Sequence, residues 1–147
     1  MMERTELIPL TRVDCLHLLA AHGLGRVVFT TSAMPAVQPV RYVLHGDEVV
    51  FQVTDGGPLS TATRHAVVVG FQVDDIDPVT HAGWSVLGVG QAYEITDADH
   101  RWVPATGSAT HPVAVPLQQL TGQRVRLGNT DTRAAVWPVV AARPVHR

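Results

Sequence analysis

Apolar residues recur along the chain at two different spacings, and the spacing changes near Gly23. Between Thr11 and Gly23 they follow steps of three and four residues, which predicts an amphipathic helix. Thr11 is expected to cap this helix, with Asp14 in the first turn, and Gly23 is expected to end it. The apolar face expected for the helix consists of Val13, Leu16, Leu19 and Ala20. Beyond Gly23 apolar and polar residues alternate, which is typical of strands.

The alternating region predicts an antiparallel meander followed by strands that close a barrel. The expected strands are 25–31, 36–44, 48–54, 66–74, 83–96, 113–115 and 123–127, with a short helix at 59–65 and the start of another at 97–102. The valine-rich strand 66–74 is expected to be central and covered on both faces. Gly88 and Gly90 are expected to mark bulges or corners of the barrel.

The composition strengthens this prediction. The chain has 147 residues, 46% of them hydrophobic and 16% charged, and its valines far outnumber its isoleucines. This size and apolar content predict one domain over 1–147, with the barrel at about 10–127 and a tail at 128–147. We therefore expect a mainly β fold, a small closed barrel with few short helices.

The charged residues exclude several kinds of chemistry. All 11 basic residues are arginine, so no lysine is present to form a Schiff base or a P-loop. The net charge of −2 predicts no nucleic-acid partner. No apolar run is long enough to span a membrane and the N-terminus does not resemble a signal peptide, so we expect no membrane partner and a cytoplasmic location. The lone Cys15 cannot form an intramolecular disulfide, in keeping with a reducing compartment.

Candidate chemistry is sparse. The eight histidines lack the spacing of metal ligands, and no nucleophile motif occurs, so the sequence predicts no metal and identifies no catalytic residue. Gly56 and Gly57 follow a strand and could cradle a phosphate with backbone N–H groups, although this sequence is also that of an ordinary turn. Arg41 or Arg64 could add the positive charge. Trp84 begins a strand, either as a core aromatic or as a flat wall for a planar ligand.

Several short segments occur in an order that resembles a known family. They are Pro39-Val40-Arg41-Tyr42, Asp47-Glu48-Val49-Val50-Phe51, Phe71-Gln72-Val73-Asp74-Asp75-Ile76-Asp77, Gly83-Trp84-Ser85-Val86-Leu87 with Gly90, and Leu120-Thr121-Gly122-Gln123-Arg124-Val125. From about Leu10 to Arg126 the sequence resembles the pyridoxamine 5′-phosphate oxidase-like flavin-binding proteins common in actinobacteria. The resemblance implies a six-stranded split β-barrel that forms a homodimer and binds FMN at the dimer interface. In family members that are enzymes, hydride or electrons pass through the flavin ring.

The resemblance also implies which residues contact the cofactor. In chain order they are Val40, Arg41, Tyr42, Gln52, Val53, Thr54, Gly56, Gly57, Pro58, Arg64, Trp84 and Ser85. The segments 40–42 and 52–54 would lie along the ring and ribityl chain, and 56–57 would face the phosphate. Residues 84–85 would approach from the partner subunit.

The sequence departs from the family at the phosphate. The family has a small hydroxyl residue followed by lysine where this chain has Gly57 and Pro58. Proline offers neither charge nor an N–H donor, and losing a charged phosphate contact lowers affinity about tenfold to a hundredfold unless Arg41 or Arg64 compensates. Alternatives to an FMN oxidoreductase are a deazaflavin-dependent reductase, a non-catalytic protein that binds flavin, haem or another planar ligand, or a protein without a cofactor.

Overall fold

The computed structural model describes residues 5–96 and 109–127, so the helix expected at 97–102 and the tail at 128–147 lie outside the described residues. The described chain is mainly β, as predicted, with two helices and one antiparallel sheet of nine strands. The helices are α1 (Arg12–Ala21) and α2 (Pro58–Arg64). The strands are β1 (Thr5–Pro9), β2 (Leu24–Thr31), β3 (Met34–His45), β4 (Glu48–Thr54), β5 (Val68–Ile76), β6 (Gly83–Gln91), β7 (Tyr93–Glu94), β8 (Thr110–Pro116) and β9 (Gln119–Leu127).

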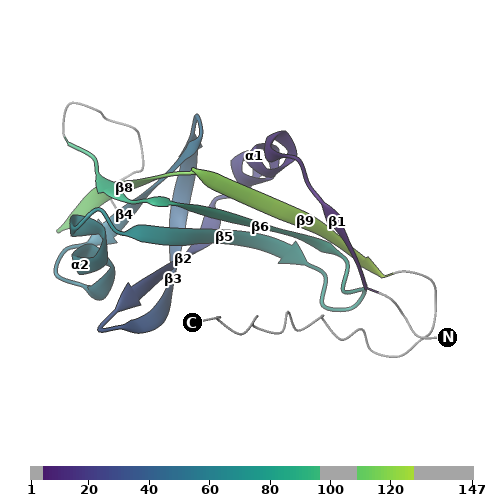
Figure 1. Cartoon of the computed structure of the whole chain (residues 1–147), viewed down its shortest axis with the longest axis horizontal. Coiled ribbons are helices and arrows are strands. Elements are labelled where there is room, and N and C mark those ends of the chain that lie inside the picture. The colour runs from purple at the N-terminus through teal and green to yellow at the C-terminus, as the bar shows by residue number, and fades with distance from the viewer. Residues whose placement is uncertain (1–4, 97–108, 128–147) are drawn as a thin grey trace, which may run out of the picture.

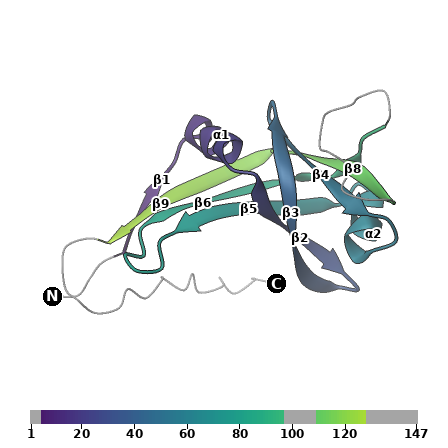
Figure 2. The same cartoon turned by 180° about the vertical axis from the view of Figure 1, so that it is seen from behind.

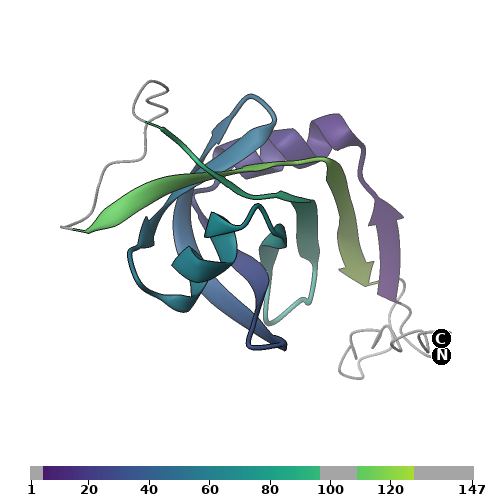
Figure 3. The same ribbon diagram turned by 60° about the vertical axis from the view of Figure 1, so that its left-hand side comes forward.

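The sheet bends into a barrel (Figures 1 and 3). Its strand order is β1-β9-β6-β5-β2-β3-β4-β8-β7, so β2, β3, β4, β5, β6 and β8 enclose the core while β1, β7 and β9 extend the sheet. The barrel closes where β6 meets β8, since a Cβ on Gly90 would lie 1.7 Å from the Pro116 carbonyl oxygen. The expectation of a barrel corner at Gly90 is therefore confirmed. The strand count is nine in the described chain, not six, because β1, β7 and β9 lie outside this ring.

Alternation along the strands fills the barrel with valine and aromatic side chains. Phe71 packs edge-on to Tyr42, with 4.8 Å between ring centroids, and stacks on Phe51 at 6.2 Å. A Cβ on Gly25 would lie 2.5 Å from the Phe71 ring, so glycine at the start of β2 makes room for that ring. These contacts hold β2 against β5 from the inside.

The prediction that both faces of β5 are covered is wrong. Val69, Phe71 and Val73 are buried inside the barrel, whereas Val68 on the outer face is 59% exposed. The two helices pack chiefly against other strands, α1 against β9 and α2 against β2 (Figure 2). The outer surface of β5 is therefore left open in the single chain.

Helix α1 begins where predicted and turns a different face to the core. The backbone N–H of Asp14 donates to the Thr11 hydroxyl at 3.1 Å, which confirms the cap. Cys15 and Leu19 are buried, whereas Val13 is 60% exposed and Ala20 is also exposed, so the predicted face is wrong at these two positions. The reason is that the Cys15 thiol packs on Gly122, where a Cβ would lie 2.6 Å from the sulfur.

The end of α1 also differs from the prediction. The C-cap is His22 in an extended conformation, and its N–H donates to the Leu19 carbonyl at 3.3 Å. Gly23 therefore follows the cap instead of forming it. In the described part of the chain, no helix has the length and apolar character needed to cross a membrane.

Candidate functional site

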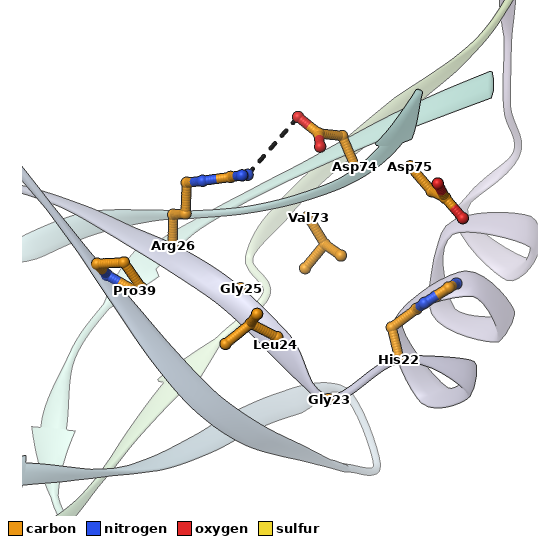
Figure 4. A pocket seen from close by; sticks show the side chains of 9 residues that line it. All are labelled: His22, Gly23, Leu24, Gly25, Arg26, Pro39, Val73, Asp74 and Asp75. Atoms are coloured by element: carbon orange, nitrogen blue, oxygen red, sulfur yellow. Dashed lines mark ion pairs between the residues drawn. The ribbon is translucent and has the colours of Figure 1, made fainter. Parts of the chain in front are cut away.

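A pocket lies where β2 and β5 separate. These strands pair at only three positions, Arg26 with Gln72 through Val28 with Gly70, and beyond Arg26 they diverge. The cavity between them has a volume of about 360 Å³ and apolar walls formed by Leu24, Pro39 and Val73 (Figure 4). An apolar pocket of this size with a few polar groups is typical of a small-molecule site.

One side of the pocket carries an ordered polar network. The guanidinium of Arg26 donates to the Gln72 side-chain oxygen at 3.0 Å and lies 3.7 Å from the Asp74 carboxylate. The Gln72 amide donates to that carboxylate at 2.7 Å and to the Ser85 hydroxyl at 3.4 Å. The network orients each side chain and places the positive charge of Arg26 next to the Asp74 carboxylate.

The other side of the pocket carries His22 and Asp75, next to α1 (Figure 4). The imidazole of His22 packs on the indole of Trp84, with centroids 4.8 Å apart and the planes tilted by 46°. Trp84 is only 7% exposed, and it is the ladder partner of Asp75. In the single chain the indole therefore supports a wall of the pocket and does not present a flat face to a ligand.

A row of outward-facing polar residues adjoins this pocket. Arg41 is the ladder partner of the pocket residue Leu24, and the β3–β4 ladder begins one residue later, at the Tyr42–Phe51 pair. Arg41 is exposed and Gln52 is half-buried. The structure thus places Arg41 next to a residue that lines the cavity.

The buried members of the predicted set point the other way. Val40, Tyr42 and Val53 are at most 7% exposed and face the barrel interior, so only their backbone could reach a ligand outside. Burial raises the pKa of the Tyr42 hydroxyl to about 12. These three side chains therefore belong to the core.

The turn after β4 has open space around Gly56. Gly56 has a φ of +79°, a conformation that favours glycine, and a Cβ there would meet nothing within 4 Å. Pro58 begins α2, and Arg64 lies in its last turn, 3.8 Å from Glu94. Arg64 is thus at the opposite end of α2 from Gly57 and already has a carboxylate partner.

His111, which the sequence did not single out, lies next to this turn. The Nδ1 atom of His111 makes a short hydrogen bond with the Asp55 carboxylate, and Nε2 lies 3.5 Å from Glu94. His111 sits in β8 opposite Val53. The pairing of β4 with β8 therefore brings the His111 imidazole to Asp55, and the pairing of β7 with β8 brings the Glu94 carboxylate to the same imidazole.

Ser85 and Trp84, adjacent in sequence, lie on opposite faces of β6. Ser85 faces outward with Gln72, Leu87, Thr121 and Gln123 around a second, shallower hollow of about 290 Å³. Of the two residues expected to approach from a partner subunit, only Ser85 has its side chain on the outer surface.

Comparison with known proteins identifies the family. The sequence model of the pyridoxamine 5′-phosphate oxidase family matches residues 11–124. The chain belongs to the pyridoxamine 5′-phosphate oxidase family. An uncharacterized protein of Mycobacterium tuberculosis is 33% identical to this family member over 133 residues, which are 82% of this chain and 86% of the relative.

Solved structures of two flavin-binding proteins share the fold of this family member. The FAD binding protein from Mycobacterium smegmatis is 30% identical, with a TM-score of 0.68, and the match covers 82% of this chain and all of the other. A FAD-binding protein from Mesorhizobium loti superposes with a TM-score of 0.65 at 22% identity, covering 84% of this chain and 99% of the other. The split-barrel expectation is therefore confirmed.

The pocket residues that the sequence did not predict lie where the β2–β5 ladder ends. His22, Arg26, Asp74 and Asp75 surround the pocket because β2 and β5 stop pairing there. The acidic run Asp74-Asp75 was visible in the sequence, but its position at the pocket depends on the β2–β5 register. No local signal marks His111.

Proposed function

We propose that the protein is a flavin-binding oxidoreductase whose flavin ring lies beside Arg41 and Gln52 and whose substrate enters the pocket between β2 and β5. The likeness to the FAD binding protein from Mycobacterium smegmatis carries this proposal, since it is 30% identical over that protein's full length. A bound flavin would supply hydride or electron transfer. The pocket beside the proposed ring position supplies a place for the other reactant.

The residues present fit the polar edge of a flavin ring. The Arg41 guanidinium carries donors only, and the Gln52 amide carries both donors and an acceptor, as the carbonyl and imide groups of such a ring require. Leu24 and Pro39 offer apolar surface next to them. Arg41 is therefore the residue we expect to orient the ring.

The pocket also holds groups that can exchange a proton. His22 is kept in place by its contact with Trp84, and Asp75 lies on the same side of the cavity. An imidazole has one nitrogen that can donate and one that can accept a proton, so His22 can act as an acid or a base as a substrate is reduced or oxidised. Sequence reasoning found no acid or base beside Trp84, and the fold supplies one.

The open outer face of the barrel supports the proposal of a homodimer. Val28 is 37% exposed and Leu87 is 41% exposed, and both lie over Gly70, where a Cβ would be 3.4 Å and 3.6 Å from them. Leu24 and Val37 continue this patch at 64% and 58% exposure. Monomeric proteins seldom expose a contiguous apolar area of this kind, and we propose that a second copy covers it. Ser85 would then reach the partner's cofactor.

The visible spectrum of the purified protein tests the proposal. We expect flavin absorption bands, or a saturable fluorescence change on adding FAD, FMN or riboflavin to the colourless protein. Repeated turnover with a nicotinamide donor and a dye acceptor would identify an enzyme. Binding without turnover would support the non-catalytic alternative, which the missing phosphate lysine favours. Binding of a deazaflavin in place of every flavin would identify a deazaflavin reductase.

A further inference from the structure

The charges along the pocket between β2 and β5 are not balanced. The Arg26 guanidinium lies 3.7 Å from the Asp74 carboxylate, so these two opposite charges offset each other (Figure 4). Asp75 lines the same pocket, and none of the described residues forms an ion pair or a hydrogen bond with its side chain. Arg26 contributes one positive charge and the two aspartates contribute two negative charges, so these three residues together carry −1. Arg124, the ladder partner of Trp84, lies one strand farther from Asp75 and does not line the pocket.

The strand register places the Asp75 carboxylate among apolar side chains. Residues two apart on a strand share a face, so Asp75 continues the row of Phe71 and Val73, which are both buried. Its ladder partner Trp84 shares that face and is also buried. Asp75 itself is exposed at the end of this row, where it lines the pocket. Because apolar neighbours reduce the screening of a charge by water, a cation bound here is attracted more strongly than on an open polar surface.

The lining of the pocket suits an organic cation better than a metal ion. The part of the chain that the structure describes contains no group of three or more histidine, cysteine, aspartate or glutamate side chains that could hold a metal. The cavity of about 360 Å³ instead has apolar walls, which suit an aromatic or aliphatic body. An ammonium group has three N–H donors, and the Asp75 carboxylate and a nitrogen of the His22 imidazole are acceptors on one side of the pocket (Figure 4).

We propose that this pocket binds a protonated amine carried on an aromatic or aliphatic body, with the ammonium group at Asp75 and the body against Leu24, Pro39 and Val73. The inference rests on the proposed function, because the same pocket is assigned there to the substrate, and it names the substrate class. Since Asp75 is exposed, its charge contributes as a partly hydrated ion pair does, and we expect a preference of about threefold to tenfold over a neutral molecule of the same shape. An anion of that shape is repelled and binds most weakly.

Three naphthalene derivatives that differ in one group test the inference on the full chain as purified. They are naphthylmethylamine, naphthylmethanol and naphthoate, titrated at pH 7.5 and followed by the amide NMR shifts of Leu24, Val73 and Asp75. We expect a dissociation constant about threefold to tenfold smaller for the amine than for the alcohol, and the largest one for naphthoate. Equal affinities of the amine and the alcohol, tighter binding of naphthoate, or no shift at the pocket with any of the three would overturn the inference.

The visible spectrum of the same sample tests the proposed flavin function separately. Flavin bands without a preference for the amine would leave the flavin proposal standing and refute the substrate class. A preference for the amine without any flavin binding would support the cation site and refute the flavin proposal. The two failures are therefore distinguishable.

Two substitutions locate the preference in the charges of the pocket. Asp75→Asn keeps the shape of the side chain and removes its charge, so the amine should bind no more tightly than the alcohol. Arg26→Gln removes the cation beside Asp74, and the preference for the amine should rise about twofold to fivefold. Asp47→Asn is the matched control, because Asp47 has a side chain that is 71% exposed and does not line the pocket.

The preference is a ratio of two affinities measured on each variant, so a partial loss of folded protein does not mimic the result. The control Asp47→Asn should keep the wild-type ratio. An unchanged ratio in Asp75→Asn, or a lower ratio in Arg26→Gln, would contradict the inference.

Discussion

The hydroxyl of Tyr42 donates a 2.6 Å hydrogen bond to the backbone carbonyl of Leu19, in the last turn of α1. Tyr42 lies in β3, so this buried bond fastens α1 to the barrel wall next to the pocket residue His22. The phenol ring also packs against Phe71. One side chain therefore connects the helix, the core and the segment 22–25 that lines the pocket.

Replacing Tyr42 with phenylalanine should lower the free energy of unfolding by about 1–2 kcal/mol, because the Leu19 carbonyl loses its shorter hydrogen bond and keeps only the 3.3 Å bond from the His22 N–H. Urea unfolding at neutral pH measures this change. The ring packing is retained in Tyr42→Phe, so a loss much larger than this range would contradict the assignment to the hydrogen bond.

Alkaline pH should destabilise the wild-type protein through the same residue. Burial raises the pKa of Tyr42 to about 12, above its ordinary value of 10, so the folded chain holds this proton more tightly than the unfolded chain. The resulting stabilisation is complete below pH 10 and is lost as the pH rises from about 10 to about 12. Between pH 10 and pH 12 the free energy of unfolding should decrease more steeply for the wild type than for Tyr42→Phe.

Barrel closure depends on glycine at position 90. A Cβ there would collide with the Pro116 carbonyl, a backbone atom that cannot move without opening the contact between β6 and β8. We expect Gly90→Ala to lower the free energy of unfolding by about 3 kcal/mol or more. Gly23→Ala is the matched control, since the nearest atom to its Cβ would be 3.8 Å away. Equal melting temperatures for the two variants would refute this view of closure.

The proposed dimer should respond to a charge in the apolar patch. Leu87→Asp sets a carboxylate at its centre, and we expect the protein to become monomeric in sedimentation velocity at micromolar concentration. Val79→Asp changes a residue that is 86% exposed outside the patch and should leave the dimer intact. A wild-type monomer under the same conditions would rule out the interface.

The two arginines proposed for the cofactor should behave differently. Arg41→Ala removes the accessible donor beside the pocket, and we expect flavin affinity to fall about tenfold to a hundredfold. Arg64 pairs with Glu94 at the far end of α2, so Arg64→Ala should change flavin affinity less than threefold. Equilibrium titration of both variants with FAD gives the comparison, and the reverse order would exclude the proposed ring position.

Local patterns predicted the elements of this fold well because they reflect local causes. Thr11 caps α1 through its own hydroxyl, and buried and exposed residues alternate along the strand 25–31. The errors in α1 have a long-range cause, since Val13 is exposed and Cys15 buried because of the position of Gly122, more than one hundred residues away in sequence. The valine content of the strand 66–74 suggested that both faces of β5 are buried. Valine content alone does not show whether the outer face of a barrel strand is covered.

The sequence predicted residues of the candidate site only where they belong to one continuous segment of the chain. Arg41, Gln52 and the turn at Gly56 came from ordered motifs, and the structure places Arg41 opposite the pocket residue Leu24. Strand register brings His111 to Asp55 at the turn, and strand register and helix packing bring His22 and Asp75 to the pocket. Neither can be derived from spacing along one segment, which is why the acid–base groups and the charge around the turn emerged only from the fold.

The short ladder between β2 and β5 also determines how the pocket can respond to its contents. Three residue pairs hold these strands together, against nine between β5 and β6, so fewer backbone hydrogen bonds have to break for β2 and β5 to separate. A molecule lodged in the seam would bridge both strands and slow hydrogen exchange at Arg26 and Gln72 more than at the opposite wall. A molecule bound in the pocket would therefore hold β2 and β5 together and make the barrel more rigid.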